Sequence, residues 1–361
     1  MSETIELNNQ KAKRRIILLI NTVLLAIGAN GGPLITRLYF IHGGKRIWLS
    51  SCLLTVGFPI ALIPIATSYH RSSRRSFSDM GSPKPKLFSL TPLLFSAFSI
   101  IGVVTGLSNY LYAYGVAKLP VSTATLIMST QLAFTAIFAF ILVKQKFTFN
   151  SVNAIILLIF GAGVLAEHAG SDRPSGESSK QYVIGFALTV VASALSGLML
   201  PTIEFMYKRT LSITYSLVME LQVVMALSAT IICIVGMIVD NDFKVISREA
   251  HEFGLGETKY YVVLVGSAIL WQFYMMGAIG IVFCASSLFS GVMISVMLPI
   301  TEILAVIFYK ESFQAEKGIS LVLSLWGFVS YFYGEFIKAK EMRKNHISET
   351  DLPLDSIVPV E

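Results

Sequence analysis

Ten long runs of apolar residues occupy most of this chain and constrain its fold more than any other feature. They span residues 16–39, 47–68, 91–117, 121–143, 151–166, 182–207, 213–239, 260–283, 286–309 and 317–337. A helix of about 20 apolar residues crosses the hydrocarbon core of a bilayer. Within that core, only helices and closed barrels satisfy all their backbone hydrogen bonds. The sequence therefore predicts an all-α membrane protein with ten transmembrane helices.

The composition supports a lipid environment and argues against nucleic acid as a partner. Of the 361 residues, 54% are hydrophobic and only 14% are charged, whereas about 25% are charged in a typical soluble domain. The net charge of +6 would suggest nucleic-acid binding in a soluble protein. In a membrane protein, basic residues instead mark the cytoplasmic loops.

One unit of the sequence occurs twice, which predicts two related halves. Residues 126–143, with Lys144 and Phe147 after them, recur 166 positions later as residues 292–309, with Lys310 and Phe313. A second match, at a spacing of 168, relates Pro33-x-Ile35-x-x-x-Tyr39 to Pro201-x-Ile203-x-x-x-Tyr207. Five spans per half is an odd number, so the second half must run in the opposite direction. Inverted repeats of this kind form a substrate site between the halves, near the bilayer midplane.

The distribution of charge predicts the orientation. The loop at 71–86 is basic, whereas the linkers at 167–180 and 240–259 are acidic, which by the positive-inside rule places both termini in the cytoplasm. The expected organisation is a cytoplasmic tail (1–15), a first five-helix repeat (16–166), an extracellular linker (167–181), a second repeat (182–337) and a cytoplasmic tail (338–361). The loop at 69–90 and the tail after 338 are polar and predicted to be disordered. The basic and apolar start resembles a signal peptide, but its length favours an uncleaved first helix.

Three carboxylates within the apolar runs are candidates for proton coupling: Glu204, Glu220 and Glu302. An ionisable group at this depth normally faces a cavity or a partner, and burial raises a carboxyl pKa so that the group can bind and release a proton. Glu204 and Glu302 each follow a proline by three positions, where the proline frees a backbone carbonyl. The alternatives are an ion pair of Glu204 with Lys208 or Arg209, and a buried hydrogen bond for Glu302.

Amides and aromatic residues form the predicted substrate site. An amide offers a donor beside an acceptor, which matches the edge of a nucleobase, and an aromatic ring stacks on a flat heterocycle. The predicted substrate-binding residues are Asn30, Asn109, Gln131, Tyr112, Trp271 and Gln272. Hydrogen bonding between helices is the alternative for each amide, and a place in the interfacial aromatic belt is the alternative for Tyr112. Gln222 lies almost opposite Glu220 on one helix, and Glu220 is preferred for the cavity.

Glycines 28, 31 and 32 with Pro33 surround Asn30. They predict either a broken helix, as at many transporter sites, or a close helix contact.

The residues that enzymes and metal sites require are missing from the apolar runs. The three cysteines form no C-x-x-C pair, and the five histidines fall in predicted loops or the tail. We therefore expect no cofactor, no metal and no intramembrane enzyme.

From residue 16 to 338, the chain resembles the plant purine permease family, a branch of the drug/metabolite transporter superfamily. The resemblance rests on Asn30-Gly-Gly-Pro33, Gly43-Gly-Lys-Arg46, Asn109-Tyr-Leu-Tyr-Ala-Tyr-Gly115, Leu119-Pro-Val-Ser-Thr123, Met219-Glu-Leu-Gln222, Trp271-Gln272, Phe313-Gln-Ala-Glu-Lys-Gly318 and Leu325-Trp-Gly-Phe-Val-Ser-Tyr331. It implies ten transmembrane helices and proton-coupled uptake of adenine, related bases and cytokinins. Some members of the family also move alkaloids or vitamin B6 compounds.

The leading hypothesis is thus a proton-coupled importer of purines and cytokinins, most simply in the plasma membrane. The alternative is an exporter or exchanger of another small solute, such as an alkaloid, a vitamin B6 compound or a nucleotide sugar. A phosphate-bearing substrate needs fixed positive charge at depth, and the sequence suggests none, because Arg37 is expected near an outer helix end. An ion channel is less consistent with paired halves.

Overall fold

The computed structural model describes residues 2–78, 90–119, 127–128, 130–167, 179–211, 213–309 and 315–350, and the regular elements within them are helical. In chain order they are α1 (Ser2–Ile41), α2 (Ile47–Leu53), the 3-10 helix η1 (Phe58–Ala61), α3 (Leu62–Ser78), α4 (Pro92–Lys118), α6 (Gln131–Val143), α7 (Phe149–Glu167), α8 (Ser179–Arg209), α9 (Tyr215–Val239), α10 (Asp242–Glu252), α11 (Glu257–Cys284), α12 (Ser287–Tyr309) and α13 (Ala315–Thr350).

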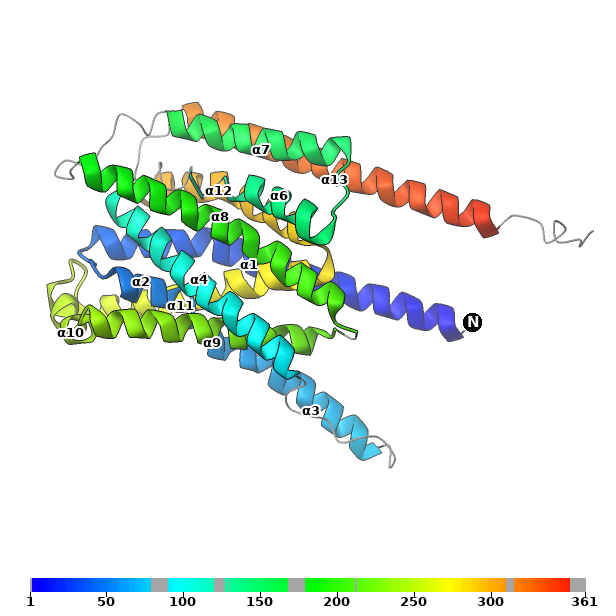
Figure 1. Ribbon diagram of the computed structural model, residues 1–361, viewed down its shortest axis with the longest axis horizontal. Coiled ribbons are helices and arrows are strands. Elements are labelled where there is room, and N and C mark those ends of the chain that lie inside the picture. Colours follow the sequence, from blue (N-terminus) through cyan, green and yellow to red (C-terminus); the bar gives the residue numbers. More distant parts are fainter. Residues whose placement is uncertain are drawn as a thin grey trace, which may run out of the picture.

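Most of these helices form one elongated bundle (Figure 1). Six stretches are long and apolar enough to cross a membrane: Lys11–Ile41, Ile47–His70, Pro92–Gly115, Lys180–Arg209, Tyr215–Val239 and Glu257–Cys284. Shorter apolar helices cover Gln131–Val143, Phe149–Gly161 and Ser287–Thr301. The chain is therefore an all-α, integral, multi-pass membrane protein.

The break in a membrane-spanning helix occurs in the second apolar run and not in the first. α1 continues through Pro33, whereas the second run divides into α2, η1 and α3. Pro59 lies in the first turn of η1, where its missing N–H interrupts the helical pattern. A Cβ at Gly57 would lie 2.2 Å from the Ala268 carbonyl oxygen, so the break packs directly against α11.

The glycines of α1 are used for close packing. A Cβ at Gly28 would lie 2.2 Å from the backbone nitrogen of Tyr274, and one at Gly277 would lie 2.4 Å from that of Leu25. Small residues let membrane helices approach to backbone contact. The two glycines thus join α1 to α11 along their length.

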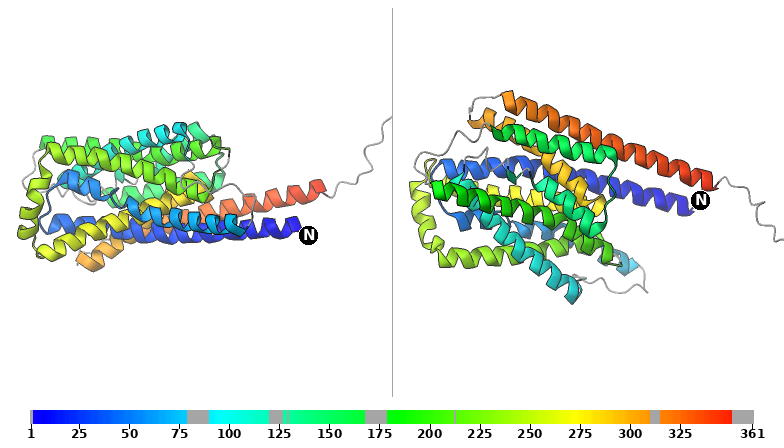
Figure 2. Two further views of the ribbon diagram at one scale, coloured as in Figure 1. Left: turned by 90° about the horizontal axis from the view of Figure 1, so that it is seen from below. Right: turned by 45° about the horizontal axis from the view of Figure 1, so that its top comes forward.

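Several polar segments that were predicted to be loops or disordered are helical. α1 begins at Ser2, α3 continues to Ser78, α13 continues to Thr350, and α10 occupies the middle of the acidic linker at 240–259. The start of α1 and the end of α13 project from the same end of the bundle, and α10 covers the opposite end (Figure 2).

Helices from distant parts of the sequence pack together. α1 lies against α11 and α12, α8 lies against α4 and α6, and α7 lies against α13. The largest cluster of buried apolar residues gathers near the middle and one end of the bundle, with Leu25, Leu200, Met219 and Ile279 fully enclosed. This packing leaves a cavity between the helices.

Candidate functional site

A cavity of about 560 Å³ lies among α1, α4, α6, α8, α11 and α12. Its wall is mostly apolar, with a small number of polar side chains, as is usual for a small-molecule site. The polar and aromatic lining residues include Thr36, Arg37, Thr105, Ser108, Asn109, Tyr112, Gln131, Ser196, Thr202, Trp271, Tyr274, Ser295 and Thr301.

The cavity reaches the end of the bundle that α10 covers. Phe40 and Ile41, at the end of α1, belong to its wall, and Ile41 is exposed. On α8, the lining residue farthest toward the opposite end is Thr202.

Four of the six predicted substrate-binding residues line this cavity: Asn109, Tyr112, Gln131 and Trp271. They come from α4, α6 and α11, which are far apart in the sequence. The side chain of Asn109 is 9% exposed, and its Nδ2 atom is buried with no hydrogen-bond partner among the described residues. A buried donor without a partner is costly, so this enclosed Nδ2 is an unsatisfied group next to the cavity wall.

Trp271 is held in a fixed orientation. Its Nε1–H donates to Thr36 Oγ1 at 3.0 Å, and Tyr274 contacts it edge to face, with centroids 5.5 Å apart. A Cβ on Gly32 would lie 3.0 Å from the indole, so the absence of a side chain there leaves room for the ring. The indole therefore forms a rigid, flat surface in the cavity wall.

Asn30 and Gln272 do not line the cavity. Asn30 Nδ2 donates to the Ala26 carbonyl at 2.7 Å, and its Oδ1 accepts from Thr301 Oγ1 at 3.0 Å, so this amide links α1 to α12. Gln272 is 1% exposed and lies beside Gly57 at the helix break. Its two polar atoms, like those of the buried Gln222, have no partner within the described parts of the chain.

The carboxylates lie outside the described cavity wall. Glu204 is 5% exposed, pairs with Lys208 Nζ at 2.8 Å and accepts a 2.7 Å hydrogen bond from the backbone N–H of Ser287 at the start of α12. The ion pair lies within α8, and the hydrogen bond joins α8 to α12, between the cavity and the end of the bundle opposite α10. Glu220 is 2% exposed on α9. Glu302 belongs to α12, but its side chain lies outside the description.

Arg37 lies one turn before the end of α1, near a helix end as expected, but it also lines the cavity, which the sequence did not predict. Its guanidinium carbon lies 5.0 Å from the centroid of the Tyr309 ring, and Tyr309 donates to the Leu34 carbonyl at 2.6 Å. Residues four apart lie on the same face of a helix. The lining residues of α1 include Ala29, Pro33, Arg37 and Ile41, so this spacing could have revealed Arg37.

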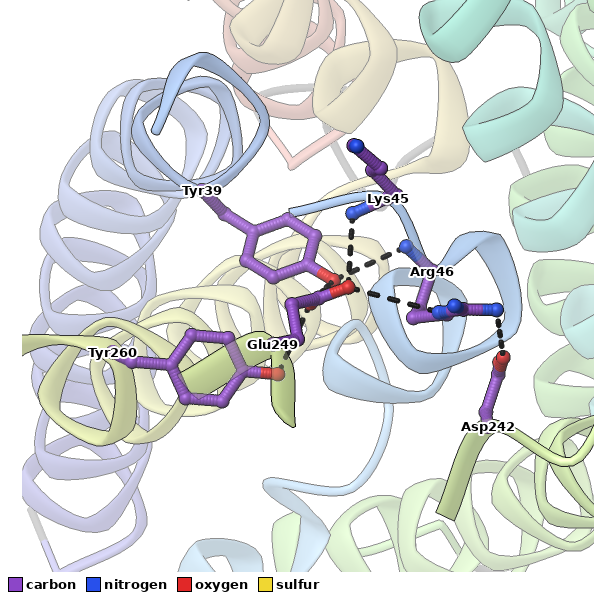
Figure 3. A network of polar contacts seen from close by, with 6 residues as sticks. All are labelled: Tyr39, Lys45, Arg46, Asp242, Glu249 and Tyr260. Carbon is purple, nitrogen blue, oxygen red and sulfur yellow. Dashed lines mark hydrogen bonds and ion pairs between the residues drawn. The ribbon is translucent and has the colours of Figure 1, made fainter. Parts of the chain in front are cut away.

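A polar cluster holds α10 against the end of α1, close to the cavity mouth (Figure 3). Glu249 accepts hydrogen bonds from Tyr39 Oη at 2.6 Å, Tyr260 Oη at 3.1 Å and the Lys45 N–H at 3.2 Å. The Arg46 guanidinium lies 3.7 Å from Glu249 and 3.6 Å from Asp242. We call these six residues the outer clamp, because they lie at the end of the bundle that α10 covers.

The acidic residues of the outer clamp are buried. Glu249 is 6% exposed and Asp242 is 2% exposed. Burial raises the pKa of Asp242 above its ordinary value, although the charge of Arg46 opposes this shift. Within the described residues, no three His, Cys, Asp or Glu side chains gather as ligands for a metal.

Comparison with known proteins identifies the family. A family model described as purine nucleobase transmembrane transport matches residues 16–341. Purine permease 3 of Arabidopsis thaliana is 52% identical over 331 residues, which cover 91% of this chain and 93% of the relative. Purine permease 2 of the same plant is 48% identical over 358 residues, which cover 96% and 99%.

The fold also occurs among solved proteins. One crystal structure aligns with a TM-score of 0.54 at 12% identity, covering 90% of this chain and 99% of the other. That likeness concerns the fold alone. On the family model and the two relatives, the chain belongs to the purine permease family of membrane transporters.

Proposed function

We propose that this chain is a secondary active transporter that takes up purine bases and cytokinins together with protons. The observation that carries the proposal is the convergence of Asn109, Gln131 and Trp271 on one cavity between the two halves of the chain. Family membership gives the substrate class, since the family model and the relatives are named for purines. The chemistry of the cavity wall matches that class.

In this proposal, the base stacks on Trp271 and hydrogen-bonds with the amides. The indole cannot swing freely because Thr36 holds it, so its face is presented without further ordering. The Nδ2 of Asn109 is enclosed and has no described partner, and a small rotation of this side chain toward the cavity lets it donate to a ring nitrogen or exocyclic oxygen of the base. A neutral, flat heterocycle satisfies both features at once.

Two inverted five-helix repeats, 16–166 and 182–337, account for the packing. If the first five spans match the last five in order, the contact of α1 with α11 corresponds to that of α8 with α4. The contact of α6 with α8 then corresponds to that of α12 with α1, and α7 meets its own counterpart α13. These contacts thus occur as symmetry-related pairs, which supports a two-fold relation, whereas the contact of α11 with α12 has no counterpart of similar extent between α4 and α6. The shorter helices α6, α7 and α12, together with α13, would complete the ten spans.

We assign the proton to the carboxylates Glu204, Glu220 and Glu302. Glu204 is the strongest candidate, because it touches the first residue of α12, a helix that lines the cavity. Protonation would remove its charge and weaken this contact.

The topology in this proposal has both tails, 1–15 and 338–361, in the cytoplasm and the 167–181 linker outside. The projection of the start of α1 and the end of α13 from one end of the bundle supports it (Figure 2). The plasma membrane is the simplest location for an uptake system.

Uptake of labelled adenine by a yeast strain that lacks base uptake tests the proposal. We expect saturable uptake that a protonophore abolishes and that adenine and trans-zeatin inhibit more strongly than caffeine or pyridoxine. Uptake insensitive to the protonophore would overturn proton coupling, and absence of adenine uptake would overturn the substrate class.

A further inference from the structure

We propose that the end of the cavity farther from α10 is an apolar compartment for a substituent of the substrate. The transporter then binds purines with a short alkyl chain on the exocyclic amine more tightly than the unsubstituted base. We call the wall formed there by Ile101, Val104, Leu198 and Met199 the inner compartment. The inference rests on the proposed function and adds a preference within that substrate class.

The groups proposed to hold the base lie toward the end of the bundle that α10 covers. Tyr110, next to Asn109 on α4, stacks on Trp48 at the start of α2, with centroids 3.9 Å apart. Trp271 is held by Thr36, which lies in the last two turns of α1. The base is therefore placed in the half of the cavity that is closer to the mouth.

The α4 side of the inner compartment lies deeper. Val104 precedes Asn109 by five positions, which is about 7.5 Å along the helix axis. This direction leads toward Phe98, whose ring stacks on Tyr207 near the opposite end of the bundle. A chain that extends from the base away from the mouth therefore reaches Val104.

The α8 side of the inner compartment faces this part of α4. Met199 Sδ lies 3.2 Å from Oγ1 of Thr105, the residue after Val104. The side chains of Val104 and Met199 are only partly buried, and both line the cavity. Methionine is flexible and fills irregular gaps, so this wall can adapt to the shape of an alkyl chain.

The described wall of the inner compartment offers apolar contact. Its four side chains are aliphatic or, in Met199, a thioether. The neighbouring hydroxyls already donate to the backbone, Thr105 to the Ile101 carbonyl at 2.8 Å and Thr202 to the Leu198 carbonyl at 2.8 Å. An apolar substituent matches this wall better than a polar or charged one.

The exocyclic amine is the position at which a chain leaves the recognition of the base intact. An alkyl group there keeps the ring nitrogens and the N9–H for the amides Asn109 and Gln131, whereas an alkyl group at N9 removes a donor. Each methylene that is buried against an apolar wall strengthens binding about fourfold.

Competition for labelled adenine uptake in yeast tests this preference. The competitors are N6-methyladenine and N6-propyladenine, with 9-methyladenine and 9-propyladenine as positional isomers. In the wild type, we expect N6-propyladenine to inhibit about tenfold more strongly than N6-methyladenine, whereas the two 9-substituted compounds should differ by less than about threefold. An equal gain in both series would mean that the chain merely partitions into apolar surroundings, and it would overturn the inner compartment.

Val104→Phe places a larger ring in the inner compartment and should bring the ratio of the two N6 inhibition constants close to one. Val103→Phe is the matched control, because the neighbouring valine is also partly buried but lies outside the described cavity wall. This variant should keep the ratio at about tenfold. An unchanged ratio in Val104→Phe would overturn the inner compartment.

If Val104→Phe does not transport adenine, the two N6 compounds are tested on the purified proteins by their effect on the thermal unfolding midpoint. N6-propyladenine should then stabilise the wild type more than N6-methyladenine does, and this difference should vanish in Val104→Phe. Equal stabilisation of the wild type by the two compounds would overturn the inner compartment. Absence of adenine uptake by the wild type would instead overturn the proposed function.

Discussion

The tyrosines Tyr39 and Tyr207, which the sequence repeat relates to one another, lie in contrasting surroundings. Tyr39, on α1, donates to Glu249 and also accepts from the Arg46 N–H at 3.2 Å. Tyr207, on α8, is equally buried, but its hydroxyl has no partner among the described residues, and its ring stacks on Phe98 with centroids 6.2 Å apart. One end of the bundle is therefore held by a polar network and the other mainly by apolar packing.

This difference suggests which end opens more easily. The outer clamp ties α10, α11 and the α1–α2 connection together through buried groups. The opposite end is joined at Glu204 by a hydrogen bond from the Ser287 N–H. The ion pair of Glu204 with Lys208 lies within α8, and Lys208 is 54% exposed, so this pair contributes little to stability. We therefore expect the Glu204 end to part during transport while the clamped end keeps its shape.

Removal of the central carboxylate of the clamp should have the largest effect on stability. Glu249→Ala leaves two buried tyrosine hydroxyls without their acceptor and Arg46 with Asp242 as its remaining described partner, which should lower the unfolding free energy by about 3–5 kcal/mol. Thermal unfolding of the purified protein measures it. Glu252→Ala, at an exposed position of the same helix, is the control and should change little. Equal effects of the two variants would contradict a stabilising clamp.

The two related tyrosines sharpen the comparison as a matched pair. Tyr39→Phe removes a hydrogen bond to a carboxylate and should cost about 1.5–3 kcal/mol. Tyr207→Phe removes a hydroxyl that makes no described hydrogen bond and should be neutral or slightly stabilising. Thermal unfolding compares the two variants. A larger loss of unfolding free energy for Tyr207→Phe than for Tyr39→Phe would contradict the view that the clamped end is the more firmly held one.

Glu204→Gln should affect transport more than stability. The amide retains an acceptor for the Ser287 N–H but loses the ion pair with Lys208, a loss of at most about 1 kcal/mol. The maximal rate of adenine uptake should change at least severalfold, because the contact between α8 and α12 no longer responds to protonation. A loss of stability as large as that of Glu249→Ala, or unchanged uptake, would contradict this view.

The smallest expected effect concerns Asp242. Its pKa is raised in the folded protein by burial, so the folded state binds a proton more tightly than the unfolded chain does. The contribution of Asp242 to stability therefore falls as the pH rises from the ordinary aspartate pKa of 3.8 through the raised value. Asp242→Asn should remove this pH-dependent component. Thermal unfolding midpoints of the wild type and of Asp242→Asn, measured from about pH 4 to pH 7, would show this pH dependence. Identical pH profiles of the two proteins would contradict it.

The apolar runs of the sequence correctly predicted an all-helical membrane protein, because hydrophobic length alone determines where helices can cross a bilayer. The sequence did not reveal α10, whose polar surface resembles a loop until Glu249 meets Tyr39 and Tyr260 from α1 and α11. It also left open a helix break or a close helix contact around Gly31 and Pro33, where the structure has the close contact, and it did not reveal the break near Pro59. Glycine signals both a break and a close contact, and only the position of α11 distinguishes the two.

The candidate site was predicted in part. The cavity is lined by Asn109, Gln131, Tyr112 and Trp271, because polar residues within a membrane-spanning helix usually face the interior of the helix bundle. Asn30 binds instead to Thr301, since any amide serves equally well to join two helices. Arg37 was missed because distance from a helix end does not tell which way a long side chain points.

Fluorescence of a single-tryptophan protein tests the central claim, stacking of a purine on Trp271, most directly. The chain has three tryptophans, and Trp48→Phe with Trp326→Phe leaves Trp271 alone. We predict that adenine quenches this emission saturably, and that Asn109→Leu raises the concentration for half-maximal quenching about tenfold, as expected for a lost hydrogen bond. If adenine is transported but leaves the emission of Trp271 unchanged, the base does not bind at this surface and the account is contradicted.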